Sequence, residues 1–324
     1  MKKPLLPCCL CLALLTVMFC AAQLLHEPEV IFPEITALAV GAILAPRQVW
    51  RVTRMRMLLL ISICAVCGVC IARFAPLPLV VQLVLAYTLA LLIAGLSRTT
   101  FFPLISALVL PVLLHTTTWI YPLSAAGMTG LVCLVQWGME HAGLRAPTAF
   151  VPVPERPDAA VCAKRLLTAG LLFCAAVALH LPFAAAPPLL VGFTELSEAE
   201  SPARKRPVAL VLLTVLAAVL GAGARGLFCV LLGLPASLAA LCGVGILLAV
   251  MCAAKLYFPP AAAITTLPFL LPQAALLRYA PAVTGGFLAL TVAAMLAFGK
   301  RPNPKGEPNA ISTHHPGRTA RAGD

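Results

Sequence analysis

The sequence predicts an all-α fold, a polytopic transmembrane helical bundle built from two parallel repeats with short proline-broken membrane segments. Three observations predict it. Of the 324 residues, 61% are hydrophobic and only 10% are charged. Apolar runs of membrane-spanning length recur along the chain, and the two halves share a pattern of residues. A soluble domain has roughly 25% charged residues, so this composition excludes a soluble enzyme, a disordered chain and a disulfide-rich secreted module.

The first apolar run, residues 5–25, follows Lys2 and Lys3 and is similar to a signal peptide. It has a counterpart within the chain at residues 166–181, where a signal peptide has no role. We therefore expect the first run to be kept as a membrane helix.

The repeat is visible as residues that recur at a nearly constant offset. Phe19, His26, Pro28 and Pro33 recur 154 residues later as Phe173, His180, Pro182 and Pro187. Further on the offset is 157 residues and the matched residues include Leu77 with Leu234, Arg98 with Lys255 and Phe101 with Phe258. This pattern predicts a first membrane repeat at 1–140, a proline-rich cytoplasmic linker at 141–162, a second repeat at 163–299 and a disordered basic tail at 300–324.

Each half shows the same order of elements. The order is a long run (5–25; 166–181), a short segment (33–46; 187–202), two long helices (57–76 and 79–97; 207–228 and 235–254), a proline-interrupted segment (101–115; 258–273) and a last helix (120–138; 281–299). A helix of about 14 residues spans about 21 Å, less than the roughly 30 Å of a hydrocarbon core. The short segments therefore either cross with the help of extended chain or enter and return.

The distribution of basic residues favours crossing. With crossing, 20 of the 23 Lys and Arg residues lie on one side, whereas re-entry gives 13 against 10. The positive-inside rule then predicts a protein of the plasma (inner) membrane with both termini cytoplasmic. Because each half crosses an even number of times, the two repeats run in the same direction.

Prolines inside the membrane are the first candidates for a functional pathway, because each leaves a backbone carbonyl without its helical partner. They occur at matching places in the two repeats: Pro103 and Pro111, and Pro259, Pro260 and Pro268. Ser106, Thr265 and Thr266 would offer hydroxyl groups beside them. The alternative is that these prolines only kink helices for packing.

Charged residues are the second set of candidates. Arg98 and Lys255 precede the two broken segments, where they would attract an anion or else anchor the helices at the membrane surface. Glu195 is either a functional acid at membrane depth or part of a polar loop.

The second repeat resembles a known family. Phe258-Pro259-Pro260-Ala261-Ala262-Ala263, followed by Leu267-Pro268, is similar to the His-Pro-Pro-Ala-Gly-Ala signature of the HPP family of membrane proteins. The family histidine is replaced by Phe258, and by Phe101 in the first repeat. The resemblance implies a permease-like domain with a small anion as a candidate cargo, since some members are associated with nitrite movement.

Together these observations predict a transporter or channel-like permease for a small solute, and the alternative is a non-transporting scaffold or subunit of a larger membrane complex. No catalytic motif is present, so we expect no enzyme and no cofactor. Cys64, Cys67 and Cys70 share a helix face, but their Ala/Gly/Val surroundings favour helix packing over a metal site. We expect the lipid bilayer and a small solute as partners, no nucleic acid, and leave a homo-oligomer open.

Overall fold

The computed structural model describes residues 5–147, 150–153, 158–198 and 201–298, and within these ranges the chain forms twelve α-helices and no strand. Eight helices are long and apolar enough to cross a membrane: α1 (Leu5–Leu25), α3 (Arg54–Phe74), α4 (Leu79–Leu96), α6 (Ile120–His141), α7 (Ala159–Ala178), α9 (Pro207–Ala224), α10 (Ala236–Ala254) and α12 (Leu276–Ala297). Four are short: α2 (Glu34–Ala39), α5 (Pro103–Leu113), α8 (Pro187–Ser197) and α11 (Pro259–Thr266). The predicted all-α bundle is confirmed, and the chain is an integral, multi-pass membrane protein.

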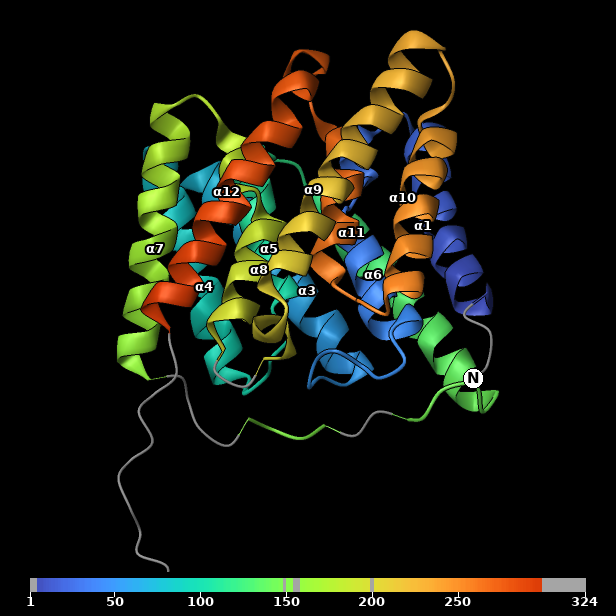
Figure 1. The fold of residues 1–324 in the computed structure, drawn as a ribbon, viewed down its shortest axis with the longest axis horizontal. Coiled ribbons are helices and arrows are strands. Elements are labelled where there is room, and N and C mark those ends of the chain that lie inside the picture. Colours follow the sequence, from blue (N-terminus) through green and yellow to red (C-terminus); the bar gives the residue numbers. More distant parts are fainter. Residues whose placement is uncertain (1–4, 148–149, 154–157, 199–200, 299–324) are drawn as a thin grey trace, which may run out of the picture.

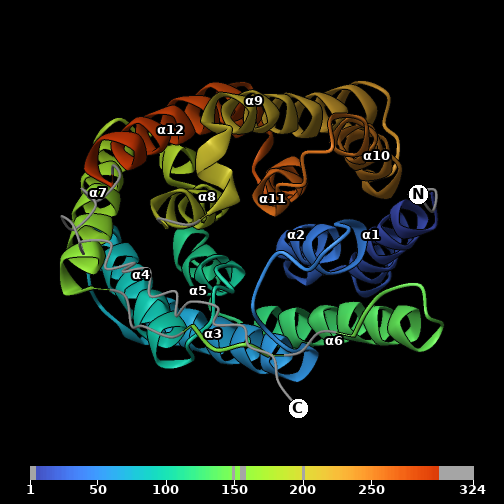
Figure 2. The same ribbon diagram turned by 60° about the horizontal axis from the view of Figure 1, so that its bottom comes forward.

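The long helices form a closed ring around the short ones, as Figure 2 shows. Around the ring, each helix contacts the next in the order α1, α10, α9, α12, α7, α4, α3, α6 and back to α1. Inside it, the short helices contact one another in the order α2, α5, α8, α11 and back to α2. The fold therefore has an outer layer that faces the membrane and an inner layer that lipid does not reach.

The outer faces of the ring are apolar. Leu59, Leu171 and Leu212 are 60%, 63% and 64% exposed on α3, α7 and α9. In contrast, every residue of α2, α5, α8 and α11 is buried. The long helices satisfy their own backbone groups and can meet hydrocarbon, whereas the short, broken segments need the shelter of the ring.

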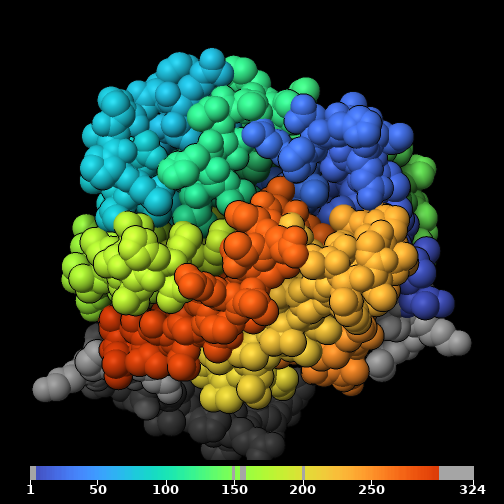
Figure 3. Space-filling view, turned by 90° about the horizontal axis from the view of Figure 1, so that it is seen from above, coloured from blue at the N-terminus to red at the C-terminus, as the bar shows by residue number. Residues whose placement is uncertain are grey.

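The two halves, α1–α6 and α7–α12, use their helices in the same way. Helix α1 contacts α10 of the other half, and α7 contacts α4 in the same manner. The inner helices also contact the other half, since α2 contacts α11 and α8 contacts α5. Seen from one end in Figure 3, the first half (blue to green) and the second half (yellow-green to red) lie side by side and their side chains meet across the middle.

A tyrosine compensates for the inner proline of each half. Pro111 and Pro268 have no N–H, so the carbonyls four residues earlier, on Ala107 and Ile264, lose their helical donors. The Tyr121 hydroxyl donates to the Ala107 carbonyl at 3.1 Å, and the Tyr279 hydroxyl donates to the Ile264 carbonyl at 2.7 Å. These two broken turns are therefore satisfied by the protein itself.

Glycines let the ring approach the inner layer at matching places. A Cβ atom on Gly68 of α3 would lie 2.3 Å from the Leu108 carbonyl oxygen, and one on Gly221 of α9 would lie 2.3 Å from the Thr265 carbonyl oxygen. Leu108 and Thr265 are 157 residues apart, the offset found in the sequence. Both helix pairs thus pack backbone against backbone, which only glycine allows.

The short segments carry the chain from one end of the bundle to the other. Near one end, Thr118 donates a hydrogen bond to Glu29, just after α1. At the opposite end, Arg51 donates its N–H to the Thr100 hydroxyl at 3.0 Å. The chain between Glu29 and Arg51, including α2, therefore crosses the bundle. We call the end that contains Arg51 the linker end, because residues 150–153 also lie there (Figure 1), with the Val153 N–H bonded to the Arg98 carbonyl at 3.0 Å.

Some predicted boundaries were wrong. Helix α7 begins at Ala159, inside the predicted 141–162 linker, because the Asp158 side chain accepts a hydrogen bond from the Ala160 N–H at 3.2 Å and caps the helix. Helix α12 begins at Leu276, ahead of the predicted start at 281, and contains Pro281. The predicted disordered tail, 300–324, lies outside the described residues.

Candidate functional site

A small cavity lies where the four short helices meet. Its volume is ≈ 10 Å³, which is room for about one water molecule. All four inner helices contribute to its wall, and the lining residues are Glu34, Ala37, Pro103, Ser106, Pro188, Val191, Pro259, Pro260 and Ala263. The cavity is therefore shared by both halves and lies inside the ring.

The first turns of the four inner helices face this cavity. Pro103, Pro188 and Pro259 lie at the starts of α5, α8 and α11, and Glu34 is the first residue of α2. Proline suits this position because its fixed φ matches a helix and its missing N–H is one that a helix start leaves unpaired. The positive ends of the helix dipoles consequently point at the cavity and favour negative charge there.

Among the described residues, Glu34 supplies the only charged side chain in the cavity wall. It is 1% exposed, and neither carboxylate oxygen has a hydrogen-bond partner among the described residues. The Glu34 backbone N–H and the Ser106 hydroxyl, across the cavity, are close enough to influence the carboxylate, but neither reaches hydrogen-bond geometry. Burial of an unpaired carboxylate costs a large amount of free energy, and inside a membrane protein such a group indicates function.

A pair of threonines joins the two halves close to the cavity. The Thr36 and Thr266 hydroxyl oxygens lie 3.1 Å apart, and Thr36 also donates to the Pro33 carbonyl at 2.7 Å. Thr265 points elsewhere, toward the carbonyls of Ala217 and Ala261, each at 3.2 Å. The hydroxyl groups on α2 and α11 therefore connect the inner helices of the two halves.

A second carboxylate lies within α8. Glu195 is 8% exposed and accepts a hydrogen bond from Trp50 Nε1 at 3.2 Å. Next to it, the Thr194 hydroxyl lies 2.9 Å from the Tyr87 hydroxyl. Of the two alternatives for Glu195, the structure places it inside the bundle rather than in a loop, and its carboxylate has a partner that Glu34 lacks.

Arginines bind near the ends of the inner segments that point away from the cavity. Arg145 donates to the carbonyls of Ile43 at 3.1 Å and Ala45 at 2.8 Å, after α2. Arg225 donates to the carbonyls of Pro268 and Leu271, after α11. At the end of α8, Arg165 donates to the Ser197 hydroxyl at 2.7 Å and to the Glu198 carboxylate at 2.7 Å. A cation near a helix C-terminus stabilises it, so these contacts hold the segments in place.

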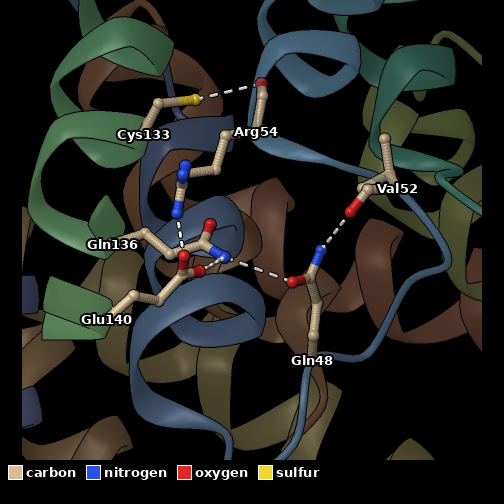
Figure 4. A network of polar contacts seen from close by, with 6 residues as sticks. All are labelled: Gln48, Val52, Arg54, Cys133, Gln136 and Glu140. Carbon is tan, nitrogen blue, oxygen red and sulfur yellow. Dashed lines mark hydrogen bonds and ion pairs between the residues drawn. The ribbon is translucent and has the colours of Figure 1, made fainter. Parts of the chain in front are cut away.

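A polar network fixes the chain between α2 and α3, as Figure 4 shows. Gln136 donates to Glu140 at 2.9 Å and to Gln48 at 3.2 Å, and Gln48 donates to the Val52 carbonyl at 2.7 Å. Arg54 forms an ion pair with Glu140 in the same network. These bonds tie the segment that follows α2 to helix α6.

A larger pocket of ≈ 80 Å³ opens at the linker end. Arg98, Arg165 and Glu198 are its charged lining residues. Arg98 follows α4 with a positive φ of 48°, and Lys255 follows α10 with a positive φ of 50°. Lys255 is exposed and does not line this pocket. The two predicted anion-attracting residues therefore lie at one end of the bundle, away from the central cavity.

The structure brings together some of the predicted site residues and separates others. Pro103, Ser106, Pro259 and Pro260 line the cavity. Thr266 lies beside it through Thr36. The turns broken by Pro111 and Pro268 are satisfied by tyrosines, so these two prolines fit the packing alternative.

Sequence reasoning missed Glu34, Arg145 and Arg165. A signal for Glu34 was present, because an acid directly follows Pro33 within an apolar segment. Burial lowers the pKa of Arg145, yet an arginine stays protonated in proteins. Its position under the end of α2 depends on the fold and has no mark in the sequence.

Comparisons with family models, with curated proteins and with solved structures gave no match.

Proposed function

We propose that this protein is a transporter or channel-like permease for a small solute, with the solute site at the central cavity between the two halves. One observation carries the proposal: a buried carboxylate without a partner, Glu34, lines a cavity built from four broken segments. Broken helices at corresponding places in two halves are the arrangement in which transporters bind solutes. A purely structural core would gain stability by replacing such a group with an apolar side chain.

The proposal includes an internal duplication, with two parallel repeats related by a pseudo-two-fold axis that runs between the ends of the bundle. Backbone geometry supports it. Among the residues that the structure describes, five that are not glycine have a positive φ, and four of them form two pairs, His26 with His180 and Arg98 with Lys255. The members of these pairs are 154 and 157 residues apart, the offsets of the sequence repeat. Positive φ is uncommon outside glycine, so independent halves would have little reason to share these positions.

A relationship to the HPP family, and a small anion as the cargo, belong to the same proposal. The cavity is surrounded by the positive ends of helix dipoles. Arg98 and Arg165 line the pocket at the linker end, which is cytoplasmic in this proposal because most basic residues gather there. Anions would be concentrated at this pocket before they enter the bundle.

The proposal is tested with purified protein in lipid vesicles and a panel of nitrite, nitrate, chloride and neutral solutes of similar size. We expect flux of at least one anion well above that of protein-free vesicles. Ala263→Val should reduce this flux at least tenfold, because Ala263 lines a cavity that holds about one water molecule. Ala253→Val is the matched control, since Ala253 is exposed on α10.

Folding of both variants is checked by size-exclusion chromatography and thermal unfolding. If no solute in the panel moves faster than in protein-free vesicles, the chain is a scaffold or subunit and the proposal is wrong. If both alanine variants behave alike, the central cavity is not the solute site.

A further inference from the structure

We infer that Glu34 is a proton-binding site of the transport cycle, so that this protein couples movement of its solute to movement of protons. This inference rests on the proposed function, because coupling requires transport. It deepens that function by naming the coupling ion and the side chain that carries it.

Burial favours the neutral form of the Glu34 side chain. Glu34 is 1% exposed and both of its oxygens lack a partner within the described residues. An ionised carboxylate in such surroundings pays a large desolvation cost, whereas a neutral carboxylic acid pays far less. The cavity beside it has room for about one water molecule, which offers a way for a proton to arrive and leave.

The small number of side-chain oxygen atoms that line the cavity favours a proton over a metal cation. A hard cation takes about six or more oxygen ligands from side chains, backbone carbonyls and water, and this cavity has room for about one water molecule. Among the residues that line the cavity, only the Glu34 carboxylate and the Ser106 hydroxyl carry side-chain oxygens, and the others are proline, alanine and valine. A proton needs one oxygen atom, which Glu34 provides.

Within the part of the chain that the structure describes, no opposite charge faces Glu34 to hold it ionised. From α6, the Tyr121 phenol is near both Glu34 and the Cys64 thiol of α3. The Tyr121 proton is already donated to the Ala107 carbonyl. From α5 the nearby polar group is Ser106, and α11 presents only Pro259, Pro260 and Ala263 to the cavity. Helix α1 also packs on α2, and its buried residues include the uncharged side chains Met18 and Phe19.

The two halves differ at this point, which gives one such site per molecule. The residue 154 positions after Glu34 is Pro188, which lines the opposite side of the cavity. Glu195 is also buried, but Trp50 donates a hydrogen bond to it. Glu34 is therefore the one carboxylate in the described inner helices that is free to exchange a proton at the cavity.

Electrostatics then gives the direction of coupling for an anionic solute. An ionised Glu34 repels an anion that enters the cavity, and a neutral Glu34 does not. Anion entry and proton binding therefore favour each other, and the two move in the same direction. A proton binds by forming an O–H bond on a Glu34 oxygen, and the same bond breaks when the proton leaves, so no other bond in the protein changes.

The protonation state is measured without any solute by infrared difference spectroscopy. Spectra of the wild type and of Glu34→Gln are compared at neutral pH, and Glu195→Gln is the matched control because it is the partnered carboxylate of α8. We expect Glu34→Gln to remove a carbonyl band of a neutral carboxylic acid that Glu195→Gln leaves in place. Loss of an ionised carboxylate band in its place would overturn the inference.

Coupling is measured in vesicles that contain a pH indicator, with the anion that gives the largest flux. Wild-type flux should fall as the pH rises, and each anion influx should acidify the interior. Glu34→Gln should lose at least nine-tenths of the proton movement and the pH dependence of the flux. If anion flux and proton movement are the same in the wild type and Glu34→Gln, the inference fails while the proposed transport stands. If the infrared result holds but no solute moves, the proton site stands and the proposed function fails.

Discussion

Helices α2 and α8 occupy equivalent places in the two halves but carry their acids at opposite ends. Helix α2 has Glu34 at its first residue, where α8 has Pro188, and α8 has Glu195 where the first half has Gly41. The Trp50 ring packs against Gly41, since an added Cβ there would lie 2.2 Å from it, and its Nε1 donates to Glu195. The two halves therefore share the positions of their backbone, and single side chains make them chemically different.

The arginines that lie near α2 and α8 also differ between the two halves, because they come from different parts of the chain. In the second half the charge is Arg165, which lies within α7. The residue 154 positions earlier is Cys11, and Arg145, which comes from the chain after α6, lies near it. Both halves therefore place an arginine at the linker end of the inner helix, but they take it from different parts of the chain. Arg165 has an acidic partner and Arg145 bonds to backbone carbonyls.

The largest effect on stability is expected where the second half depends on a charge pair. Glu198→Leu should lower the free energy of unfolding by about 3 kcal/mol, because it leaves the Arg165 guanidinium buried without its acid. This is the lower end of the range for a broken buried pair, since the Glu198 side chain is itself 40% exposed. Arg165 is 2% exposed, and its remaining side-chain partners are the Ser197 hydroxyl and the Phe102 ring, whose centroid lies 6.0 Å from the guanidinium carbon. Chemical denaturation in detergent measures the loss. The double variant Arg165→Met/Glu198→Leu should recover most of it, and a single variant as stable as the wild type would contradict this reading of the charge pair.

A smaller effect, equal in the two halves, is expected at the glycines of the ring. Gly68→Ala and Gly221→Ala should each cost about 2–3 kcal/mol, because each new Cβ would lie 2.3 Å from a carbonyl oxygen of the facing inner helix. Gly127→Ala and Gly285→Ala are the matched controls, with no atom within 4 Å of the added Cβ. The controls should be neutral or gain up to about 1 kcal/mol. Thermal unfolding of the four variants measures these changes. A strong difference between Gly68→Ala and Gly221→Ala would show that the two halves do not pack alike at these positions.

Much of the fold could be predicted because it depends on patterns of neighbouring residues along the sequence. A run of about 20 apolar residues predicts a membrane helix wherever it falls, and the long helices other than α7 and α12 lie within a few residues of the predicted ranges. The predicted start of this helix at 281 was wrong because α12 begins at Leu276 and contains Pro281. The start of α7 was wrong because a capping aspartate, Asp158, lies inside the polar linker.

The candidate site could be predicted only in part. Pro103, Ser106, Pro259 and Pro260 were accessible to sequence reasoning because prolines in apolar segments are visible as such. The meeting of four helix starts at one cavity is a property of the closed inner layer and depends on contacts between helices far apart in the chain. Glu34 became a candidate only when the structure showed that its oxygens have no partner.

The smallest effect is expected at the tyrosines that compensate for the inner prolines. Tyr121→Phe and Tyr279→Phe should each cost about 1–2 kcal/mol, because each leaves a buried carbonyl, on Ala107 or Ile264, without a donor. The two sites lie in different halves and share no partner, so the double variant should lose the sum of the two. Denaturation curves of the three variants measure this. Equal single losses support a common role for Pro111 and Pro268, whereas a loss confined to one tyrosine would mean that the other carbonyl finds water, and that its proline opens toward a hydrated path.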